Sequence, residues 1–463
     1  MMKKHEIIYG ECQTPLQRNA IKFLSESLLD YLYEYPACVS LEEHFAKENT
    51  RKIYIGTKKT NPAFSGASFR YDEEYCITVR DDDVYIEGYD DLGVLYGCVD
   101  FFARYLTKLS YPNDDRYVIN PLEGKLPDWN FSSHPAVKHR GLWTWGHVLY
   151  DYRGYLENMA RLKLNTLTIW NDHVPLNAKE LVEYAHGLGI RVIFGYSWLW
   201  STDCKTVPFD RLTDFSESIF EKYEREYAPL HPDGIYFQSA TELHTEAVGG
   251  TVIAEAVTAF VNHTASLFFE KYPDLELQFG LHATSVKNRL SVIRAVDPRI
   301  RIVWEDVGAF PFSYFPCDVE NTEETDALVR NISVLRGESD RFGAVTKGLT
   351  KLDWSSFSHL PMPLYIGASS EAMKQNRMQR KRPIWKYVQA YWIAHADLAN
   401  RAVKLMKDIK KGELYISALL EDGMFEREIM YPAALFAEML WDPEREMKAL
   451  MSDVALRSDV IFA

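Results

Sequence analysis

The strongest constraint on the fold is an alternation that begins at Val137, where eight short apolar runs alternate with longer segments that have helical periodicity. In order, the runs are HRGLWTWG, NTLTIWNDH, RVIFGYSWLW, DGIYFQSATELH, LELQFGLHAT, IRIVWEDVGAF, a seventh that is either FGAVTKG or PLYIGAS, and ELYISALLEDG. Strands that alternate with helices in this way are typical of βαβ units and a parallel sheet. Eight units in one direction predict a closed (β/α)8 TIM barrel, and no G-x-G-x-x-G motif follows the first run to favour a dinucleotide-binding sheet.

A different pattern precedes the barrel. YCITVRDDDVYIEGYD holds two alternating runs on either side of three aspartates, which predicts a hairpin. The apolar residues of GVLYGCVDFFARYLTKL then recur with a helical period. Because 463 residues exceed one ordinary core, we predict a small α/β domain over 1–132 and the barrel with its C-terminal helices over 133–463. A proline-bearing stretch at 121–135 is expected to link them.

Charge and composition narrow the range of partners. A net charge of −14 opposes binding to nucleic acid or to an anionic membrane surface. No apolar stretch has the length needed to cross a bilayer, and the start MMKKHEIIYGECQTPLQ lacks the apolar run of a signal peptide. The six cysteines are scattered without metal-type spacing, which predicts free thiols in a reducing compartment. We therefore expect a cytoplasmic protein that uses no cofactor and no metal, with oligomerisation left open.

Enzymes built on this barrel carry their active sites at the carboxyl ends of the strands, where the loops converge. The residues expected there are rich in carboxylates, tryptophans and histidines, namely Trp143, Trp145, Asp172, His173, Trp198, Trp200, Glu242, His244, His282, Trp304, Glu305, Asp306 and Glu421. Glycoside hydrolysis requires two carboxyl groups that face one pocket, one to protonate the leaving oxygen and one to supply or activate the nucleophile. Tryptophan rings complement this chemistry because the C–H faces of sugars stack on them, so a carbohydrate is the expected ligand.

Each of these residue types also has a structural interpretation. Glu242, in the fourth run, is either a catalytic acid or a carboxylate that pairs with a lysine or caps a helix. The tryptophans of the first and third runs either line the mouth of the barrel or pack between the strands and the helices. The histidines either bind the ligand or form ordinary polar contacts. Metal-dependent hydrolysis is disfavoured because no H-x-H follows the first strand.

Several segments resemble known carbohydrate-active families. YCITVRDDDVYIEGYDDLGVLYGCVDFFARYL resembles the non-catalytic α/β domain that precedes the barrel in glycoside hydrolase families 20, 67, 84 and 115. VKHRGLWTWG is similar to the segment that opens the barrel of family 20 β-N-acetylhexosaminidases, which implies that Arg140 binds sugar hydroxyls; the alternative for Arg140 is a salt bridge that closes the barrel bottom. ISALLEDGMFEREIMYPAALFAEMLW resembles the family 20 ending, with Glu421 on the substrate-binding glutamate and Leu419 in place of a tryptophan.

The fourth run departs from family 20. That family ends the strand with an Asp-Glu pair, whereas this chain has Thr241 before Glu242. FQSATELH looks instead like the fourth strand of family 67 α-glucuronidases, although the aspartate that follows their sixth strand has no counterpart in WEDVGAFPF. We predict an exo-acting glycoside hydrolase with Glu242 as general acid and Asp306, Glu305 and Glu421 as candidates for the second role. The alternative is a catalytically inactive sugar-binding barrel, and the sugar and its anomeric configuration stay open.

Overall fold

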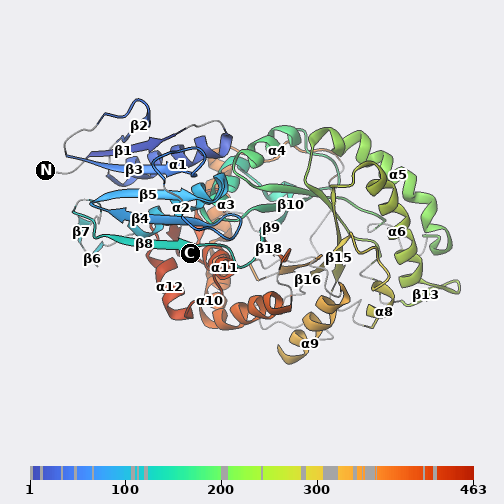
Figure 1. Cartoon of the computed structure of the whole chain (residues 1–463). Coiled ribbons are helices and arrows are strands. Elements are labelled where there is room, and N and C mark those ends of the chain that lie inside the picture. Colours follow the sequence, from blue (N-terminus) through green and yellow to red (C-terminus); the bar gives the residue numbers. More distant parts are fainter. Residues whose placement is uncertain are drawn as a thin grey trace.

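The chain builds an open sheet from residues 4–133 and a closed barrel from His139 onward (Figure 1). The computed structural model describes residues 4–10, 14–32, 35–45, 49–64, 67–105, 110–111, 114–118, 122, 124–199, 207–240, 243, 245–282, 288–305, 322–336, 341–346, 348–349, 360, 362–409, 412–420 and 425–463.

The N-terminal sheet has the strand order β2-β1-β3-β5-β4-β8. Its strands are β1 (Lys4–Tyr9), β2 (Ala37–Ser40), β3 (Thr50–Gly56), β4 (Tyr75–Arg80), β5 (Asp83–Gly88) and β8 (Trp129–Ser133). β2, β1, β3 and β5 run parallel to one another, while β4 is antiparallel to both its neighbours, β5 and β8. The remaining elements of this unit are α1 (Pro15–Leu32), α2 (Asp91–Tyr105) and the ribbon of β6 (Ser110–Tyr111) and β7 (Asp114–Val118).

β4 and β5 form the predicted hairpin. Arg80 pairs with Asp83, so the loop consists of Asp81 and Asp82, whose φ angles are 53° and 75°. Positive φ at both central residues is the type I′ geometry that matches the twist of the flanking strands, and aspartate adopts it more readily than most residues. The helix predicted after the hairpin is α2, whose apolar side packs against β4 and β5.

The predicted linker is wrong in part, because residues 129–133 form the strand β8. β8 pairs antiparallel with β4 at the edge of the sheet. Trp129 and Phe131 alternate onto one face, where Trp129 contacts the ring of Tyr105 and Phe131 contacts that of Tyr75. Aromatic contacts of this kind stabilise a strand that has only one neighbour. The expected domain boundary therefore falls inside a strand.

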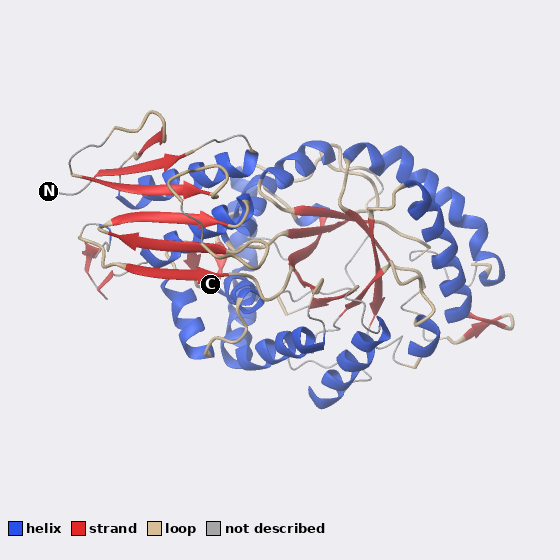
Figure 2. Cartoon of the chain, in the orientation of Figure 1, coloured by secondary structure: helices blue, strands red, loops and turns tan. Residues whose placement is uncertain are grey.

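The barrel consists of parallel strands surrounded by helices (Figure 2). The strands are β9 (His139–Trp145), β10 (Thr166–Trp170), β11 (Arg191–Gly195), β12 (Gly234–Phe237), β15 (Glu276–His282), β16 (Arg301–Glu305), β17 (Phe342–Thr346) and β18 (Tyr415–Leu419). β18 pairs with β9 and closes the barrel. The predicted fold, a (β/α)8 barrel preceded by a small α/β domain, is confirmed, and β17 shows that the ambiguous seventh strand is FGAVTKG.

The helices of the barrel lie on its outside (Figure 2). They are α3 (Tyr152–Arg161), α4 (Ala178–Gly187), α5 (Ser216–Lys222), α6 (Ile253–Lys271), α8 (Leu290–Ile293), α9 (Thr322–Ser333), α10 (Glu371–Ile409), α11 (Tyr431–Trp441) and α12 (Met447–Leu456). α10 is interrupted at His395, whose φ of −128° is not helical. Two small strand pairs complete the chain, β13 (Ala247–Val248) with β14 (Thr251–Val252) and β19 (Ile429–Met430) with β20 (Val460–Ile461). No helix in the described part of the chain is both long enough and apolar enough to cross a membrane.

The two units meet through helices, paired charges and aromatic rings. α1 contacts α4 and α2 contacts α3, so these helices lie between the sheet and the barrel (Figure 1). The buried Nζ of Lys163 lies 2.8 Å from Oδ1 of Asp100 and 3.3 Å from Oε1 of Glu438. Trp441 stacks on Tyr75 with ring centroids 5.9 Å apart. Breaking a buried ion pair leaves an uncompensated charge, so these contacts fix the sheet against the barrel.

Candidate active site

The last residues of the barrel strands define the end of the barrel where a site is expected. Five of the predicted site residues lie outside the described residues, namely Trp200, Glu242, His244, Asp306 and Glu421. The others fall into three places: the barrel interior near the strand ends, the rim, and positions away from this end.

Glu305 is the last residue of β16, and its carboxylate lies inside this end of the barrel. Its side chain is buried, and its Oε1 accepts hydrogen bonds from the hydroxyl of Tyr236 and from Nε2 of Gln238. Nε2 of Gln238 also donates to the hydroxyl of Tyr236 at 3.2 Å. His282, the last residue of β15, is the register neighbour of Glu305. Two donors on one oxygen suit a carboxylate that keeps its charge, and so a base or a charge-stabilising group rather than a proton donor.

A glycine on the intervening strand makes this arrangement possible. β15 lies between β12 and β16, and a Cβ at Gly280 would come within 2.0 Å of the hydroxyl of Tyr236. The missing side chain therefore lets the Tyr236 ring reach across β15 to Glu305. Burial, and then the negative charge of Glu305, raise the pKa of Tyr236 well above its ordinary value. The phenol consequently stays protonated and continues to donate.

Three tryptophans fill the barrel interior beside Tyr236. Trp143, Trp145 and Trp170 are 3 to 6% exposed, and they belong to the apolar cluster that points inward from the strands. Ring centroids lie 5.4 Å apart for Trp143 and Trp145, 5.9 Å for Trp145 and Trp170, and 5.8 Å for Trp143 and Tyr236. Trp145 and Trp170 are register partners at the last position of their strands, so they form the layer nearest the loops. Nε1 of Trp143 is buried and has no hydrogen-bond partner among the described residues.

The rim next to β10 carries polar groups. Asp172 is partly buried, and its Oδ2 accepts a hydrogen bond from the backbone N–H of Leu360 at 3.0 Å. Burial lowers the pKa of His147, and the negative charge of Asp172 acts in the opposite direction, so the two side chains lie close enough to interact. The backbone carbonyl of His173 accepts a hydrogen bond from Nδ2 of Asn171. This loop therefore holds a carboxylate and a histidine at the edge of the strand ends.

Two predicted tryptophans do not face this end of the barrel. Trp198 is fully buried and stacks on Phe237 at 3.6 Å between ring centroids and on Phe268 of α6 at 5.4 Å. Because β11 ends at Gly195, strand alternation no longer governs the direction of Trp198. Trp304 belongs to the cluster between the strands and the helices, since it alternates with the inward-pointing Glu305. Both side chains pack between the strands and the helices, which for Trp198 is the alternative that the sequence left open.

The predicted sugar ligand Arg140 lies at the opposite end of the barrel. It is the second residue of β9 and is fully buried. Its guanidinium donates to the carbonyls of Lys163 at 2.9 Å and Val137 at 2.8 Å, and it pairs with Glu73 of the N-terminal sheet unit at 2.5 Å. These contacts correspond to the alternative interpretation, a salt bridge at the barrel bottom. Because a strand's second residue is near its amino end, Arg140 lies away from the loops where a sugar site is expected.

Glu242 lies outside the described residues, but two residues that follow it are held by hydrogen bonds. The carbonyl oxygens of Leu243 and Thr245 accept hydrogen bonds from Arg289 at 3.0 and 3.2 Å. Arg289 immediately precedes α8, so the loop after β12 is tied to the loop after β15. Ala240, which precedes Glu242, has a φ of 51°, which marks a sharp change of direction after the strand.

Tyr236, Gln238 and Trp170 lie in the candidate site but were not among the residues predicted from the sequence. A signal was present, because Tyr236 and Gln238 are two positions apart near a strand end and therefore share a face. Trp170 similarly ends a run whose neighbour ends in Trp145. In the described ranges, no three histidine, cysteine, aspartate or glutamate side chains gather as a metal site.

Comparison with known proteins gives similarity in structure only. No protein-family model matches the sequence, and no curated protein sequence matches it either. The β-N-acetylhexosaminidase from Bacteroides fragilis NCTC 9343 has a TM-score of 0.55 at 14% identity, over 96% of this chain and 88% of that chain. A mutant Streptomyces plicatus β-hexosaminidase in complex with its product GlcNAc has a TM-score of 0.54 at 12% identity, over 99% of this chain and 92% of that chain.

A larger enzyme shares the same fold. A family 138 glycoside hydrolase that targets the pectin rhamnogalacturonan II has a TM-score of 0.51 at 14% identity, over 96% of this chain. This chain spans 51% of the length of that enzyme. The structural neighbours are thus glycoside hydrolases, and at identities this low they establish the shared architecture of a barrel with an α/β domain.

Proposed function

We propose that the protein is an exo-acting glycoside hydrolase that removes a terminal sugar, of the β-N-acetylhexosaminidase or α-glucuronidase type. The observation that carries the proposal is the group formed by Glu305, Tyr236 and Gln238 beside three tryptophans at the carboxyl end of the barrel. A carboxylate oriented by fixed donors next to aromatic faces suits a sugar whose ring carbon becomes positively charged. The fold of the glycoside hydrolases described above supports the same class.

Glu242 is the proposed general acid. It follows the fourth barrel strand, in a run that resembles the acid-bearing strand of family 67. Glu305 is the proposed second carboxylate because a phenol and an amide donate hydrogen bonds to it and orient it at the strand end. Asp306 is the competing candidate for that role, and Glu421 is proposed to bind the sugar.

The sugar is proposed to contact the tryptophans nearest the loops. Trp145 and Trp170 would offer ring faces and edges, and the indole N–H of Trp143 would donate to a hydroxyl. Asp172 and His173 at the rim, with His282 next to Glu305, would bind further hydroxyls. Trp200 and His244 are retained as candidates from the sequence alone.

The test begins with aryl glycosides of both anomeric configurations, including N-acetylhexosaminides and glucuronides, with release of the phenol as the readout. With the substrate found, Glu242→Gln should slow glycosides with poor leaving groups far more than activated ones, because only the former require protonation. Glu255→Gln, on the exposed side of α6, is the matched control and should leave both rates unchanged. Equal rates of Glu242→Gln and the wild type on both substrate types would exclude the assignment.

One observation favours the alternative of an inactive sugar-binding barrel. Thr241 stands where family 20 enzymes have the aspartate that orients the substrate acetamide, so acetamide-assisted hydrolysis lacks one of its groups. A protein that binds a monosaccharide saturably in tryptophan fluorescence, and releases no phenol from any glycoside of that sugar, would support this alternative and overturn the hydrolase proposal.

A further inference from the structure

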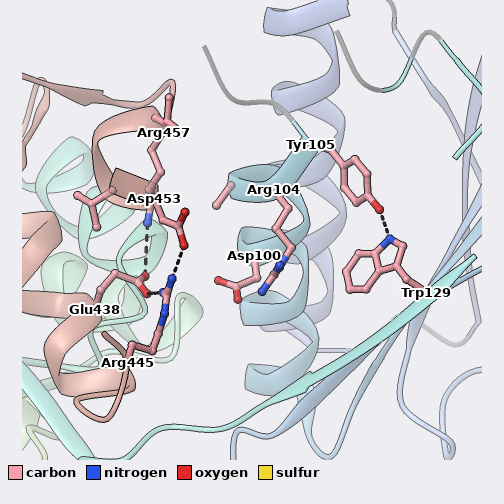
Figure 3. A pocket seen from close by; sticks show the side chains of 11 residues that line it. Asp100, Arg104, Tyr105, Trp129, Glu438, Arg445, Asp453 and Arg457 are labelled. Carbon is pink, nitrogen blue, oxygen red and sulfur yellow. Dashed lines mark hydrogen bonds and ion pairs between the residues drawn. The ribbon is translucent and has the colours of Figure 1, made fainter. Parts of the chain in front are cut away.

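A second cavity lies where the N-terminal sheet unit meets the C-terminal helices, and Figure 3 shows it from close by. Its volume is about 480 Å³, and its walls come from α2, β8, α11 and α12. Lys163, which bridges Asp100 and Glu438 in its wall, belongs to the loop before β10. The cavity is therefore near the amino end of the barrel strands, away from Glu305.

The charged groups that line this cavity balance one another. Three are arginines and three are carboxylates, namely Arg104, Arg445, Arg457, Asp100, Glu438 and Asp453. A lining with no net charge gives neither an anion nor a cation the local potential that would concentrate it. Charge balance thus points to a neutral ligand rich in hydrogen-bonding groups.

Part of this lining is rigid and part has hydrogen-bonding capacity left. Burial acts to raise the pKa of Asp100, but Lys163 and the hydroxyl of Tyr75 outweigh it and hold that pKa below its ordinary value. Nη1 of Arg457 and Nη1 of Arg445 lie 3.7 and 3.8 Å from the carboxylate of Glu438. These distances are too long for hydrogen bonds, although they are close enough for charge attraction. Nη2 of Arg445 donates to Asp453, so Nη1 of Arg445 is left to donate to a ligand, whereas Arg457 is buried and is held by two hydrogen bonds to Asp459.

The opposite wall is aromatic. Trp129 donates its indole N–H to the hydroxyl of Tyr105, which fixes the orientation of its ring (Figure 3). Trp129 is partly exposed, so its ring borders the cavity. The guanidinium of Arg104 lies over the ring of Phe131 at 3.8 Å, which holds this planar donor group between the aromatic wall and the charged wall.

We propose that this cavity, hereafter the seam site, binds a neutral mono- or disaccharide. Forked arginine and carboxylate groups match pairs of neighbouring hydroxyls, and an aromatic face matches the C–H side of a sugar ring. The volume falls in the range of small-ligand sites. The seam site is separate from the end of the barrel where hydrolysis is proposed, and its occupation does not depend on that reaction.

The test measures binding of methyl glycosides of glucose, galactose, mannose and N-acetylglucosamine, with inorganic phosphate as a separate arm, by calorimetry and saturation-transfer NMR. At least one neutral glycoside is expected to bind, and Asp453→Asn should weaken it by about tenfold, the loss of one hydrogen bond to a charged group. Arg445→Ala should weaken the binding of the same glycoside. Asp214→Asn is the matched control, because Asp214 is an exposed partner of Arg211 in a similar ion pair, and it should leave the affinity unchanged.

The outcomes separate this proposal from the proposed hydrolase function. If no glycoside in the panel loses affinity in either seam-site variant, the seam-site proposal is overturned, whatever the hydrolase activity. The seam-site proposal would also be overturned if phosphate binds to the wild type and binds more tightly to Asp453→Asn, since removal of a negative charge favours an anion. Loss of glycoside binding in both variants, with unchanged thermal unfolding, would support it even if the protein hydrolyses nothing.

Discussion

The contact between Gly280 and Tyr236 makes a prediction that needs no substrate. In Gly280→Ala the new methyl group would lie 2.0 Å from the hydroxyl of Tyr236, so the ring must move and release Glu305. Overpacking of a barrel interior costs about 1–3 kcal/mol. Loss of a hydrogen bond to a charged group costs about 1.5–3 kcal/mol more. Tyr236→Phe alone removes the same hydrogen bond and should cost about 1.5–3 kcal/mol.

The two substitutions should therefore be non-additive. In the Tyr236→Phe background the hydrogen bond is already absent, so Gly280→Ala should cost only the overpacking part, about 1–3 kcal/mol. The expected coupling between the two positions is about 1.5–3 kcal/mol, in the sense that the double variant is more stable than the sum of the single effects predicts.

The assay is urea unfolding at pH 7, followed by tryptophan fluorescence and far-UV circular dichroism. Gly141→Ala serves as the control, because its methyl group would meet the backbone carbonyl of Thr166, at the other end of the barrel, at 2.5 Å. Its cost should add to that of Tyr236→Phe within about 0.5 kcal/mol. Coupling below about 0.5 kcal/mol between Gly280→Ala and Tyr236→Phe would refute the claim that the glycine exists to admit the tyrosine hydroxyl.

Three further predictions concern the two ends of the barrel. Glu276→Gln should lower the free energy of unfolding by about 3–5 kcal/mol at pH 7, since it breaks a buried ion pair. Burial opposes ionisation of Glu276, but its two arginine partners hold its pKa well below the ordinary value. The difference in unfolding free energy between the variant and the wild type should therefore shrink as the pH falls below about 4. Trp145→Ala should abolish a saturable fluorescence change on sugar binding, whereas Trp198→Ala should leave binding intact and lower stability by about 3–5 kcal/mol; the reverse pattern would contradict the site. Arg140→Lys should lower stability by about 1.5–3 kcal/mol in urea and leave KM for an aryl glycoside unchanged, and a raised KM would return Arg140 to the sugar site.

Hydrophobic periodicity was sufficient to find the barrel, because each strand is a short apolar run that lies between two segments with helical periodicity. It failed for β1, which the sequence analysis did not identify. That strand buries His5 and Glu6, whose polar groups are accommodated by Arg51 at 3.3 Å and His44 at 3.0 Å. Because these partners are distant in sequence, the residues around His5 and Glu6 do not show that the two polar side chains can be buried.

The site was harder to predict because direction within a strand depends on register. Trp304 and Glu305 are consecutive, so only one of them can point into the barrel. The side chain of Val303 points inward, and alternation then places Glu305 inside and Trp304 outside. For Arg140 the information was present, since its place at the start of a predicted strand already indicated the barrel bottom. The link from Tyr236 across β15 to Glu305 depends on packing between strands, which no single run of sequence contains.

The two ends of the barrel treat a buried glutamate differently, and the difference makes a last prediction. Glu276, the first residue of β15, accepts hydrogen bonds from Arg301 at 2.8 Å and Arg191 at 3.0 Å, so cations compensate its charge. Glu305, the last residue of β16, accepts hydrogen bonds from the neutral hydroxyl of Tyr236 and from the neutral amide of Gln238. Neutral donors of this kind orient a carboxylate without adding a positive charge, and a carboxylate oriented in this way is useful beside a positively charged transition state.

Replacing that charge should therefore separate stability from activity. Glu305→Gln keeps an oxygen that accepts from the same donors, so the free energy of unfolding should change by no more than about 1 kcal/mol or rise, while kcat/KM on aryl glycosides falls by at least about a hundredfold. Glu276→Gln should behave in the opposite way, with lower stability and little change in kcat/KM per folded molecule. Urea unfolding and initial rates on the same preparations provide both measurements. A Glu305→Gln variant that loses about 3 kcal/mol or more of stability would show that this carboxylate is structural, and Asp306 and Glu421 would then remain as candidates for the second catalytic group.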